Sequence, residues 1–441
     1  MKLDVHALAE FAVATYNSRS IPPAARDKAT IRFVDGLACL YAGCKQPHGE
    51  LAKRFLLKRT GSGSTVIPGA IAVAPEYAAW CHGLLMHSID WDDWTFTLMH
   101  PTAVTLPSVM AVAEYKQVEA RVMLDAFVCA VETVLRLARA VNPELYMRGW
   151  HPSGTIGSIG SAVASGLVLG HSAEQLRHGI ALALCQAAGT FGNRGTMGKP
   201  FQVGNSNRAG VMAALLVEDG FDGADDILDA KFGFTETVLA GIEARAPAWS
   251  SADWEIMREW PVKPFPVGGS RQTLIEATIR ARTKLGIRSS DDVGAITCRV
   301  SEVIAHIDHD VPSSWLDSRF SHRYCTAVAA ADGKAAPEQF AAPRFARGDV
   351  QDLMARVSVI ADATLESDAS HGFPSIVEMV HSDGRRHTES STGVVGENVT
   401  MADSCKKLDE VIAAGRTAAG VVAKLTGTGK VPELVKALAF S

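Results

Sequence analysis

The densest group of polar residues in the chain lies in the segment from His87 to Trp94. It places three aspartates within four positions, and a second histidine, His100, follows shortly after it. Three carboxylates are costly to bury unless a function requires them, whereas the two histidines are suited to proton transfer or to metal binding. The alternative is a solvated acidic loop at the end of a helix, although Trp91 and Trp94 favour a partly packed one. The sequence alone leaves both interpretations open.

Two further segments carry residue types that fit catalysis or ligand binding. Tyr146–Thr155 contains Arg148 and His151 and precedes a glycine-rich helix, whose N-terminus would favour an anion. Thr196–Pro200 places Lys199 in a predicted loop between two apolar helices, where it could hold a carboxylate or shuttle a proton. Taken singly, such a histidine is more typical of a structural role, and such a lysine more often points into water.

A fourth polar segment, His306–Asp310, could form a metal cluster because histidine and aspartate both bind divalent ions. A polar loop after a strand is the favoured interpretation, because such residues more commonly form one. The sequence contains no HExxH, GxSxG or Walker A pattern. The 8 cysteines form no CxxC pair, so neither a zinc knuckle nor a disulfide scaffold is predicted.

Composition excludes several classes of protein. The chain has 441 residues, of which 47% are hydrophobic and 21% charged, an ordinary globular balance. Its 43 basic and 48 acidic residues give a net charge of -5, so no positive surplus is available for nucleic-acid phosphates. No apolar stretch reaches the ~18 residues that a membrane span needs, and the N-terminal segment resembles an amphipathic helix rather than a signal peptide. We therefore expect a soluble, cytoplasmic protein that binds neither nucleic acid nor membranes.

The elements that must position these residues differ between two parts of the chain. Up to about residue 265, apolar residues recur at helical spacing, so this part is predicted to be all-helical. The predicted helices are Ala24–Leu40, Leu106–Lys116, Arg121–Ala140, Gly157–Gly170, Ser172–Gln186 and Arg208–Glu218.

After Lys263–Pro266 the pattern changes to β-branched, alternating segments. The predicted strands are Ala295–Ala305, Arg356–Ile360, Ile376–Val380 and Arg386–Ser390, with a hairpin turn at residues 382–384 and helices at Gln272–Lys284 and Tyr324–Ala331. The tail from Ala402 returns to helical spacing. We therefore predict a mainly α fold with an α+β insert: a large helical domain of residues 1–266 and 398–441, and a smaller α+β domain of residues 267–397.

Together these segments resemble the MmgE/PrpD family, which includes 2-methylcitrate dehydratase, cis-aconitate decarboxylase and iminodisuccinate epimerase. The resemblance runs through nearly the whole chain, and seven motifs follow in the family's order. They are Ile21–Gly43, His87–Asp93 with His100-Pro101, Tyr146–Thr155, Thr196–Lys199, Gly220-Phe221 with Ile227-Leu228, Lys263–Pro266, and Arg319–Gly333.

The resemblance implies a helical domain formed by both chain ends, an α+β lid over a cleft, and a homodimer. It also implies cofactor-free, metal-free chemistry on a small di- or tricarboxylate. The positions that match the family's cleft or acid–base residues are Asp90, His100, Tyr146, His151 and Lys199. On this view Lys199 and a protonated His151 stabilise an enediolate-like charge, and one of Asp90, His100 and Tyr146 is the base. Arg148 and Arg271 are further candidates for binding a carboxylate.

Two positions depart from the family's pattern. Gln272 stands where dehydratases and decarboxylases usually have a histidine, and glutamine cannot shuttle a proton near pH 7. Trp94 stands where a threonine often follows the acidic segment, a change that should reshape the cleft. We expect both side chains to contact the substrate, and we expect His306, which is also a candidate for substrate binding, or His309 to replace the missing proton carrier on the lid side.

These features favour a dehydratase-like lyase that abstracts a proton next to a carboxylate. Within the same fold, the alternative is an epimerase of an iminodisuccinate-like dicarboxylate. A family member that binds carboxylates without turnover is a second alternative, made plausible by Gln272. A metal hydrolase using the residues between His87 and His100 is a third.

Overall fold

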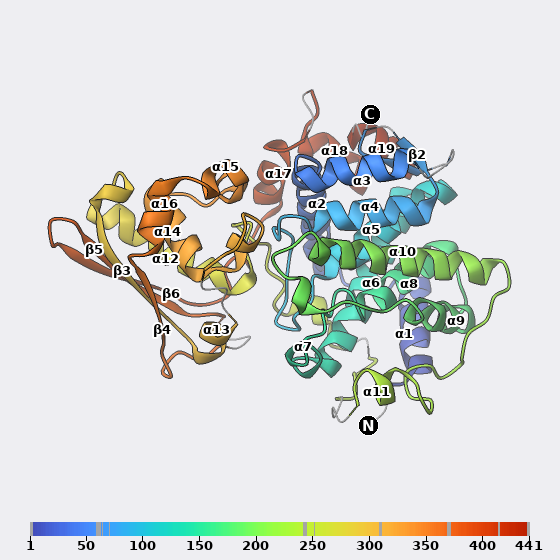
Figure 1. Cartoon of the computed structure of the whole chain (residues 1–441). Helices are drawn as coiled ribbons and strands as arrows, with labels where there is room; N and C mark the ends of the chain where they lie inside the picture. The colour runs from blue at the N-terminus through green and yellow to red at the C-terminus, as the bar shows by residue number, and fades with distance from the viewer. Residues whose placement is uncertain are drawn as a thin grey trace.

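The computed structural model describes residues 3–58, 63, 65–69, 71–240, 245–250, 252–307, 311–367, 372–412 and 415–438. It contains two hydrophobic cores. One is formed by residues 3–260 together with residues 408–438, and the other by residues 267–379. Figure 1 shows the first on the right, built from helices, and the second on the left, built around a sheet. We call them the helical region and the α+β region, and they confirm the predicted fold class.

The helical region is assembled from both ends of the chain. Its first helices are α1 (Val5–Ser18), α2 (Pro23–Cys44), α3 (Pro47–Leu57), α4 (Pro75–Met86), α5 (Pro101–Lys116) and α6 (Ala120–Val141). They are followed by α7 (Glu144–Met147), α8 (Gly157–Leu169), α9 (Ala173–Leu184), α10 (Gly198–Glu218) and α11 (Phe234–Thr237). The C-terminal helices are α17 (Met401–Asp409), α18 (Ala418–Thr426) and α19 (Val431–Leu438). Four of these helices begin with proline, which suits the first position because its missing N–H would be unbonded there anyway.

Small residues let the central helices approach closely. A Cβ atom at Gly210 in α10 would lie only 2.2 Å from the Ser161 hydroxyl in α8, so only glycine fits there. Helices α5 and α8 are buried on nearly all sides, as expected of helices at the centre of a large core.

The α+β region holds a four-stranded sheet in the order β4-β3-β5-β6. The strands are β3 (Val293–Val300), β4 (Val357–Ala361), β5 (Ser375–His381) and β6 (Arg386–Ser391), and only the β3–β4 pair is parallel. The helices are α12 (Gln272–Leu285), α13 (Glu302–His306), α14 (His322–Asp332), α15 (Ala342–Phe345) and α16 (Gly348–Met354). Helices α12 and α14 pack on the sheet, and alternate residues of β5 are buried against them.

Three local features differ from the sequence-based expectations. The predicted strand from Ala295 to Ala305 ends at Val300, and α13 follows it. The short hairpin of β1 (Thr65–Ile67) and β2 (Ile71–Val73) was not predicted, because three-residue strands carry almost no periodicity. Helix α10 begins ten residues before the predicted Arg208, so Lys199 lies in its first turn rather than in a loop.

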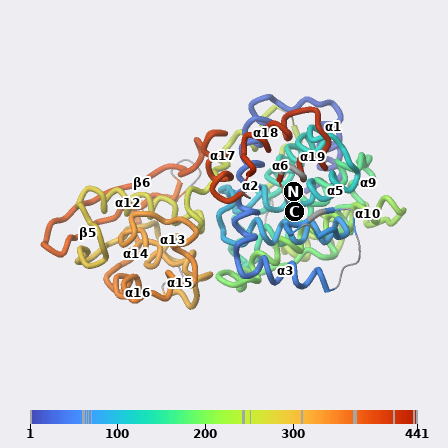
Figure 2. Tube along the Cα trace, turned by 90° about the horizontal axis from the view of Figure 1, so that it is seen from above, coloured from blue at the N-terminus to red at the C-terminus, as the bar shows by residue number. Residues whose placement is uncertain are grey.

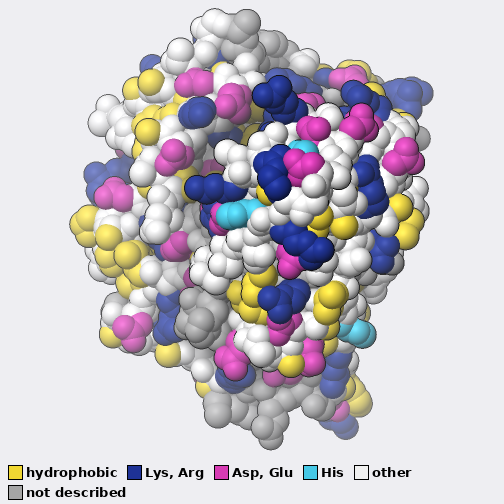
Figure 3. All heavy atoms as spheres, turned by 90° about the vertical axis from the view of Figure 1, so that its left-hand side faces the viewer, with side chains coloured by type: hydrophobic (Ala, Val, Ile, Leu, Met, Phe, Trp, Pro, Cys, Tyr) yellow, Lys and Arg dark blue, Asp and Glu magenta, His cyan; other side chains and the backbone are white. Residues whose placement is uncertain are grey.

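The last part of the chain returns from the α+β region to the helical one. Figure 2 shows α17 lying where the two regions meet, and α17 packs on α2. On the face of the α+β region in Figure 3, basic side chains are interspersed with acidic ones. Among the described helices, none combines the length and apolar character needed to cross a bilayer.

Candidate active site

The acidic segment is buried between two helices. It leaves α4 at Met86 and enters α5 at Pro101, and Asp90, Asp92 and Asp93 are 4%, 0% and 1% exposed. Each of the three carboxylates has its own cationic or hydrogen-bonding partners. Of the two interpretations that the sequence left open, the solvated loop is therefore wrong.

Asp90 holds two lysines together. Its backbone is left-handed, with φ of 54°, a conformation that aspartate tolerates better than most residues. Lys199 Nζ lies 3.3 Å from Oδ2, while Lys263 donates to Oδ1 and also, at 3.0 Å, to the Asp90 carbonyl. Burial opposes the charge, but the two ammonium groups hold the pKa of Asp90 well below its usual value. This environment fits a fixed counter-ion better than a general base.

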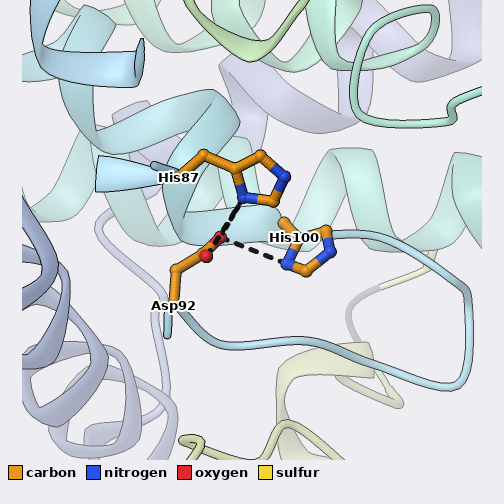
Figure 4. Close-up of side chains that lie close together, drawn as sticks. All are labelled: His87, Asp92 and His100. Atoms are coloured by element: carbon orange, nitrogen blue, oxygen red, sulfur yellow. Dashed lines mark hydrogen bonds and ion pairs between the residues drawn. The ribbon is translucent and has the colours of Figure 1, made fainter. Parts of the chain in front are cut away.

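Asp92 connects the two histidines of the segment, as Figure 4 shows. Its Oδ2 lies 2.9 Å from His87 Nδ1 and 3.1 Å from His100 Nδ1. The other ring nitrogen of His87, Nε2, is 2.7 Å from Lys199 Nζ. Burial lowers the pKa of His87 to about 4, so the ring is neutral near pH 7. His87 then donates from Nδ1 to Asp92 and accepts from the lysine at Nε2.

His87, Asp92 and His100 are also a group close enough to hold a metal ion, with ligand atoms within 4.8 Å of one another. The local charge argues against that use. The ammonium group of Lys199 already lies against His87, and a divalent cation beside it would meet strong repulsion. The same atoms form a consistent hydrogen-bonded network without a metal.

His100 and His151 each present a nitrogen suited to accept a proton. His100 Nδ1 donates to the Asp93 carbonyl at 2.8 Å and faces Asp92, so Nε2 carries the lone pair. His151 Nδ1 donates to Gln202 Oε1 at 2.7 Å, and its buried Nε2 has no partner among the described residues. Burial, reinforced by the charge of Lys199, holds the pKa of His151 well below its usual value. The ring is therefore neutral, which corrects the expected imidazolium.

The Asp93 carboxyl is held by hydrogen bonds that connect the acidic segment to its neighbours. It accepts hydrogen bonds from the Trp260 indole and the Thr102 hydroxyl, and one from the Thr102 amide at 3.3 Å in the first turn of α5. Burial raises the pKa of Asp93 to about 7. This carboxyl joins the segment to α5 and to residue 260.

The C-terminal segment supports the acidic segment from behind. Lys407 in α17 forms a buried ion pair with Asp35 in α2, with Nζ 2.7 Å from Oδ1. The same Nζ donates to the Trp91 carbonyl at 2.9 Å and lies 4.2 Å from the centre of the Trp91 ring. Three segments far apart in sequence are thereby fixed to one another.

Many of these groups line a cavity of about 100 Å³ that lies between the two regions and opens to solvent. Its lining includes all five residues that the sequence predicted as catalytic and two predicted as substrate-binding: Asp90, His100, Tyr146, His151 and Lys199, with Trp94 and Arg271. The structure thus brings together residues spread over about 180 positions of the chain.

Three predicted substrate-binding residues lie outside this lining. Arg148 is exposed and donates to the Ala240 carbonyl. His306 is exposed on α13, and the rest of the His306–Asp310 segment except Ile307 falls outside the described residues. The amide of Gln272 bonds to the backbone of Phe265 at 2.9 and 3.2 Å and of Val267 at 3.2 Å. Its polar atoms serve the chain, so we no longer place it against the substrate.

Sequence reasoning missed several residues that line the cavity. Arg194 and Lys263 add positive charge, and Phe320 and Phe373 add aromatic surface. Arg194 donates to the Ile307 carbonyl at 2.9 Å, while burial and the nearby Arg271 lower its pKa. Lys263 belongs to a motif that the sequence analysis identified, but only the fold shows that its side chain reaches Asp90. Nothing in the sequence distinguishes Phe373 from an ordinary loop phenylalanine.

Comparison with known proteins gives matches along most of the chain. The model of the MmgE/PrpD N-terminal domain matches residues 6–246, and that of the C-terminal domain matches residues 265–415. Cis-aconitate decarboxylase of Homo sapiens is 27% identical over 299 residues, which are 66% of this chain and 62% of that protein. The enzyme of the same name from Mus musculus is 27% identical over 296 residues, covering 65% and 60%.

A cis-aconitate decarboxylase of Aspergillus terreus is 21% identical over 445 residues, covering 95% of this chain and 90% of that protein. The chain therefore spans about three fifths of the length of the mammalian relatives, and nine tenths of the fungal one. The two domain models in their order, on a helical region followed by an α+β region, establish that this chain belongs to the MmgE/PrpD family.

Proposed function

We propose that this protein is a lyase that acts on a small di- or tricarboxylate, using its own side chains for proton transfer next to a carboxylate. The observation that carries the proposal is the pairing, in one cavity, of histidines that can accept a proton with cations that can bind carboxylates. His100 is backed by Asp92, while Lys199 and Arg271 line the same space. The names of the relatives, all decarboxylases of a tricarboxylate, agree with this chemistry.

His100 is the preferred base. Its Nδ1–H is oriented by the Asp93 carbonyl and lies 3.1 Å from the Asp92 carboxylate, so that Nε2 can take a proton and the charge of Asp92 stabilises the resulting imidazolium. Its side chain is 15% exposed, so a ligand in the cavity can reach it. His151 is backed only by the neutral amide of Gln202, which makes it the weaker base and a candidate for the second proton transfer.

Lys199 stabilises the charge that develops on the substrate carboxylate. Two of its N–H groups serve His87 and Asp90, and the third has no acceptor among the described residues, so it can donate to a ligand. When His100 removes a proton from the carbon next to a carboxylate, the electron pair moves onto that carboxylate. In a dehydration the C–O bond then breaks, and an acid such as Tyr146 protonates the leaving hydroxide. A decarboxylation needs no such proton removal: the bond between a carbon and its carboxylate breaks, carbon dioxide leaves, the electron pair stays on that carbon, and an acid protonates it.

Epimerisation is the second candidate, because His100 and His151 both offer a basic nitrogen in one cavity. An epimerase needs two such groups on opposite faces of a carbon. Binding without turnover is the remaining alternative, because Gln272 lacks the proton-carrying ring of the family's histidine; it predicts carboxylate binding without exchange.

The test is incubation with a panel of di- and tricarboxylates in deuterated water, followed by NMR. We expect deuterium exchange next to a carboxylate together with loss of water or carbon dioxide from one panel member. Inversion without loss would favour the epimerase. Lys199→Ala should abolish the signal, whereas Lys334→Ala, which removes an exposed lysine paired with Glu338 at 2.6 Å, should not. No exchange with any panel member by the folded wild-type protein would refute the proposal.

A further inference from the structure

A short series of hydrogen bonds holds the ring of His151. The amide of Gln202, near the start of α10, donates from Nε2 to the Thr190 carbonyl at 3.0 Å. Its oxygen, Oε1, lies 2.7 Å from His151 Nδ1. The backbone adds a second connection, because the N–H of His151 donates to the Gly189 carbonyl at 3.1 Å. Three separate segments of the helical region therefore meet at the Gln202 amide.

The side chain of Gln202 is closely enclosed by the backbone. The residue is 8% exposed. A Cβ atom at Gly189 would lie 3.0 Å from Gln202 Cδ and 3.1 Å from Oε1, and the φ of 124° at this residue also favours glycine. A Cβ atom at Gly154 would lie 3.3 Å from Gln202 Cβ. The absence of side chains at these two positions leaves room for the amide and limits where it can lie.

The partners of the amide determine which way it faces. A carbonyl oxygen only accepts hydrogen bonds, so the NH₂ group must face Thr190 and Oε1 must face His151. The ring nitrogen beside Oε1, Nδ1, must then carry a hydrogen. In a neutral imidazole the other nitrogen, Nε2, keeps the lone pair. Neutral histidine in water favours the opposite tautomer, so this arrangement depends on the protein.

The amide also differs from a carboxylate in bringing no charge to the ring. At His100 the Asp92 carboxylate, 3.1 Å away, favours an imidazolium. At His151 the amide offers no such stabilisation, and burial together with the charge of Lys199 keeps the pKa well below its usual value. The other titratable groups near the ring are His87 and His100, whose protonation would also oppose a charge on His151.

Resting on the proposed function, we propose that Gln202 is a positioning residue that fixes His151 with a hydrogen on Nδ1 and a lone pair on Nε2. His151 then enters the reaction as a proton acceptor and not as an acid. A substrate group beside Nε2 must be a hydrogen-bond donor or an acidic C–H, because a bare carboxylate would meet the lone pair. The carboxylates of the substrate are therefore assigned to Lys199 rather than to His151.

The first test is ¹⁵N NMR of the full chain, labelled at its 14 histidines, near neutral pH. His151→Phe identifies the signals of this ring by their loss. We expect the wild-type ring to be protonated at Nδ1 only. Gln202→Met removes the acceptor at similar side-chain length and should move hydrogen to Nε2. The matched control is Gln351→Met in α16, where the amide donates to the Phe345 carbonyl at 2.7 Å, and this change should leave the His151 signals unaltered.

A second variant tests the role of charge. Gln202→Glu places a carboxylate beside Nδ1, so the midpoint of the His151 titration should rise by about one pH unit or more. A change that merely disturbed packing would not produce a rise in this direction. An unchanged midpoint in folded Gln202→Glu protein would overturn the inference, as would a wild-type ring that is protonated at Nε2 or charged near neutral pH. The wild-type measurement needs no variant, so it decides the question even if Gln202→Met or Gln202→Glu misfolds.

The outcomes separate this inference from the proposed function. A wild-type protein that turns over a carboxylate but protonates His151 at Nε2 would overturn the inference alone. Protonation at Nδ1 in a folded protein that exchanges no member of the carboxylate panel would refute the proposed function and leave the position of the hydrogen standing. If both hold, Gln202→Met should lower kcat more than it raises KM, because it changes the acceptor and not the carboxylate contacts.

Discussion

The helical region and the α+β region contribute different chemistry to one cavity. From the helical region come groups that gain or lose protons, above all His100 and His151, with Asp90 and Asp92 behind them. Among the described lining residues, the α+β region contributes Arg271, aromatic and aliphatic side chains and glycines, but no histidine and no carboxylate.

This difference implies a division of labour. His100 and His151, the proposed proton-transfer groups, are held by Asp92 and Gln202 within a large packed core, which fixes their orientation. The α+β region supplies binding surface. Substitutions in the helical region should therefore mainly lower kcat, and those in the α+β region should mainly raise KM.

The largest effect is expected for Asp90→Asn. The change leaves Lys199 and Lys263 buried without their shared anion, which should destabilise the fold by about 3–5 kcal/mol and abolish turnover. Urea unfolding and kcat/KM measure the two effects. Asp383→Asn is the control, because this residue of the α+β region pairs with Arg385 at the surface. Similar losses of stability and of kcat/KM in Asp90→Asn and Asp383→Asn would contradict the difference between the two regions.

A large loss of rate is expected for His100→Ala. Removal of a general base typically lowers kcat by about 10²–10⁴-fold, and KM should change little. The control is His306→Ala in the α+β region, where the exposed side chain lies outside the cavity lining. Steady-state kinetics should show an almost normal enzyme. A normal kcat for His100→Ala would shift the role of base to His151.

Two adjacent residues test the α+β region. Arg271 donates to the Ser270 hydroxyl at 2.7 Å and to the Phe320 carbonyl, so Arg271→Ala should lower stability. It should also raise KM by about 10- to 150-fold, because the cavity lining loses a cation that can bind a carboxylate. Gln272→Ala should leave KM within about threefold while lowering stability by about 1–3 kcal/mol, because its amide supports the backbone. Kinetics and urea unfolding of both variants check this. If Gln272→Ala lowers kcat at constant KM, the amide takes part in the reaction after all.

The smallest effect concerns stability and pH. Between about pH 4 and 7, folded Asp93 keeps a proton that the unfolded chain releases, since burial raises its pKa to about 7. The bound proton therefore stabilises the fold at low pH. Across this window the stabilisation falls by about 1.4 kcal/mol for each pH unit, and it is lost once the pH exceeds about 7. The difference in unfolding free energy between the wild type and Asp93→Asn should fall accordingly. Parallel pH curves would show that Asp93 titrates normally.

The sequence predicted several long helices, among them α2, α5 and α6, and the four strands of the larger sheet, because their signals are local. It did not predict α3 and α4. The turn at residues 382–384 marks the β5–β6 hairpin. The strand predicted over Ala295–Ala305 runs past the end of β3 at Val300. The reason is that α13, with only five residues, is too short to show a helical period.

The site was only partly predictable, because its partners are distant in sequence. The spacing of residues 87–100 indicates chemistry, but Asp90 is completed by Lys199 and Lys263, more than 100 positions later. Gln272 differs from the histidine that is usual in the family, which predicted a contact with the substrate. In the structure its amide bonds instead to the backbone of Phe265 and Val267. Such orientations depend on packing, which no pattern of residue types reveals.

The pairing of Lys407 with Asp35 also has a consequence for the order of synthesis. A ribosome completes the acidic segment and all the groups that line the cavity well before it adds α17. Until then Asp35 has no cation to offset its burial, and the Trp91 carbonyl lacks its donor. The nascent chain therefore carries every candidate catalytic group before it has the support that orders them, so the site should become ordered only after α17 has been added.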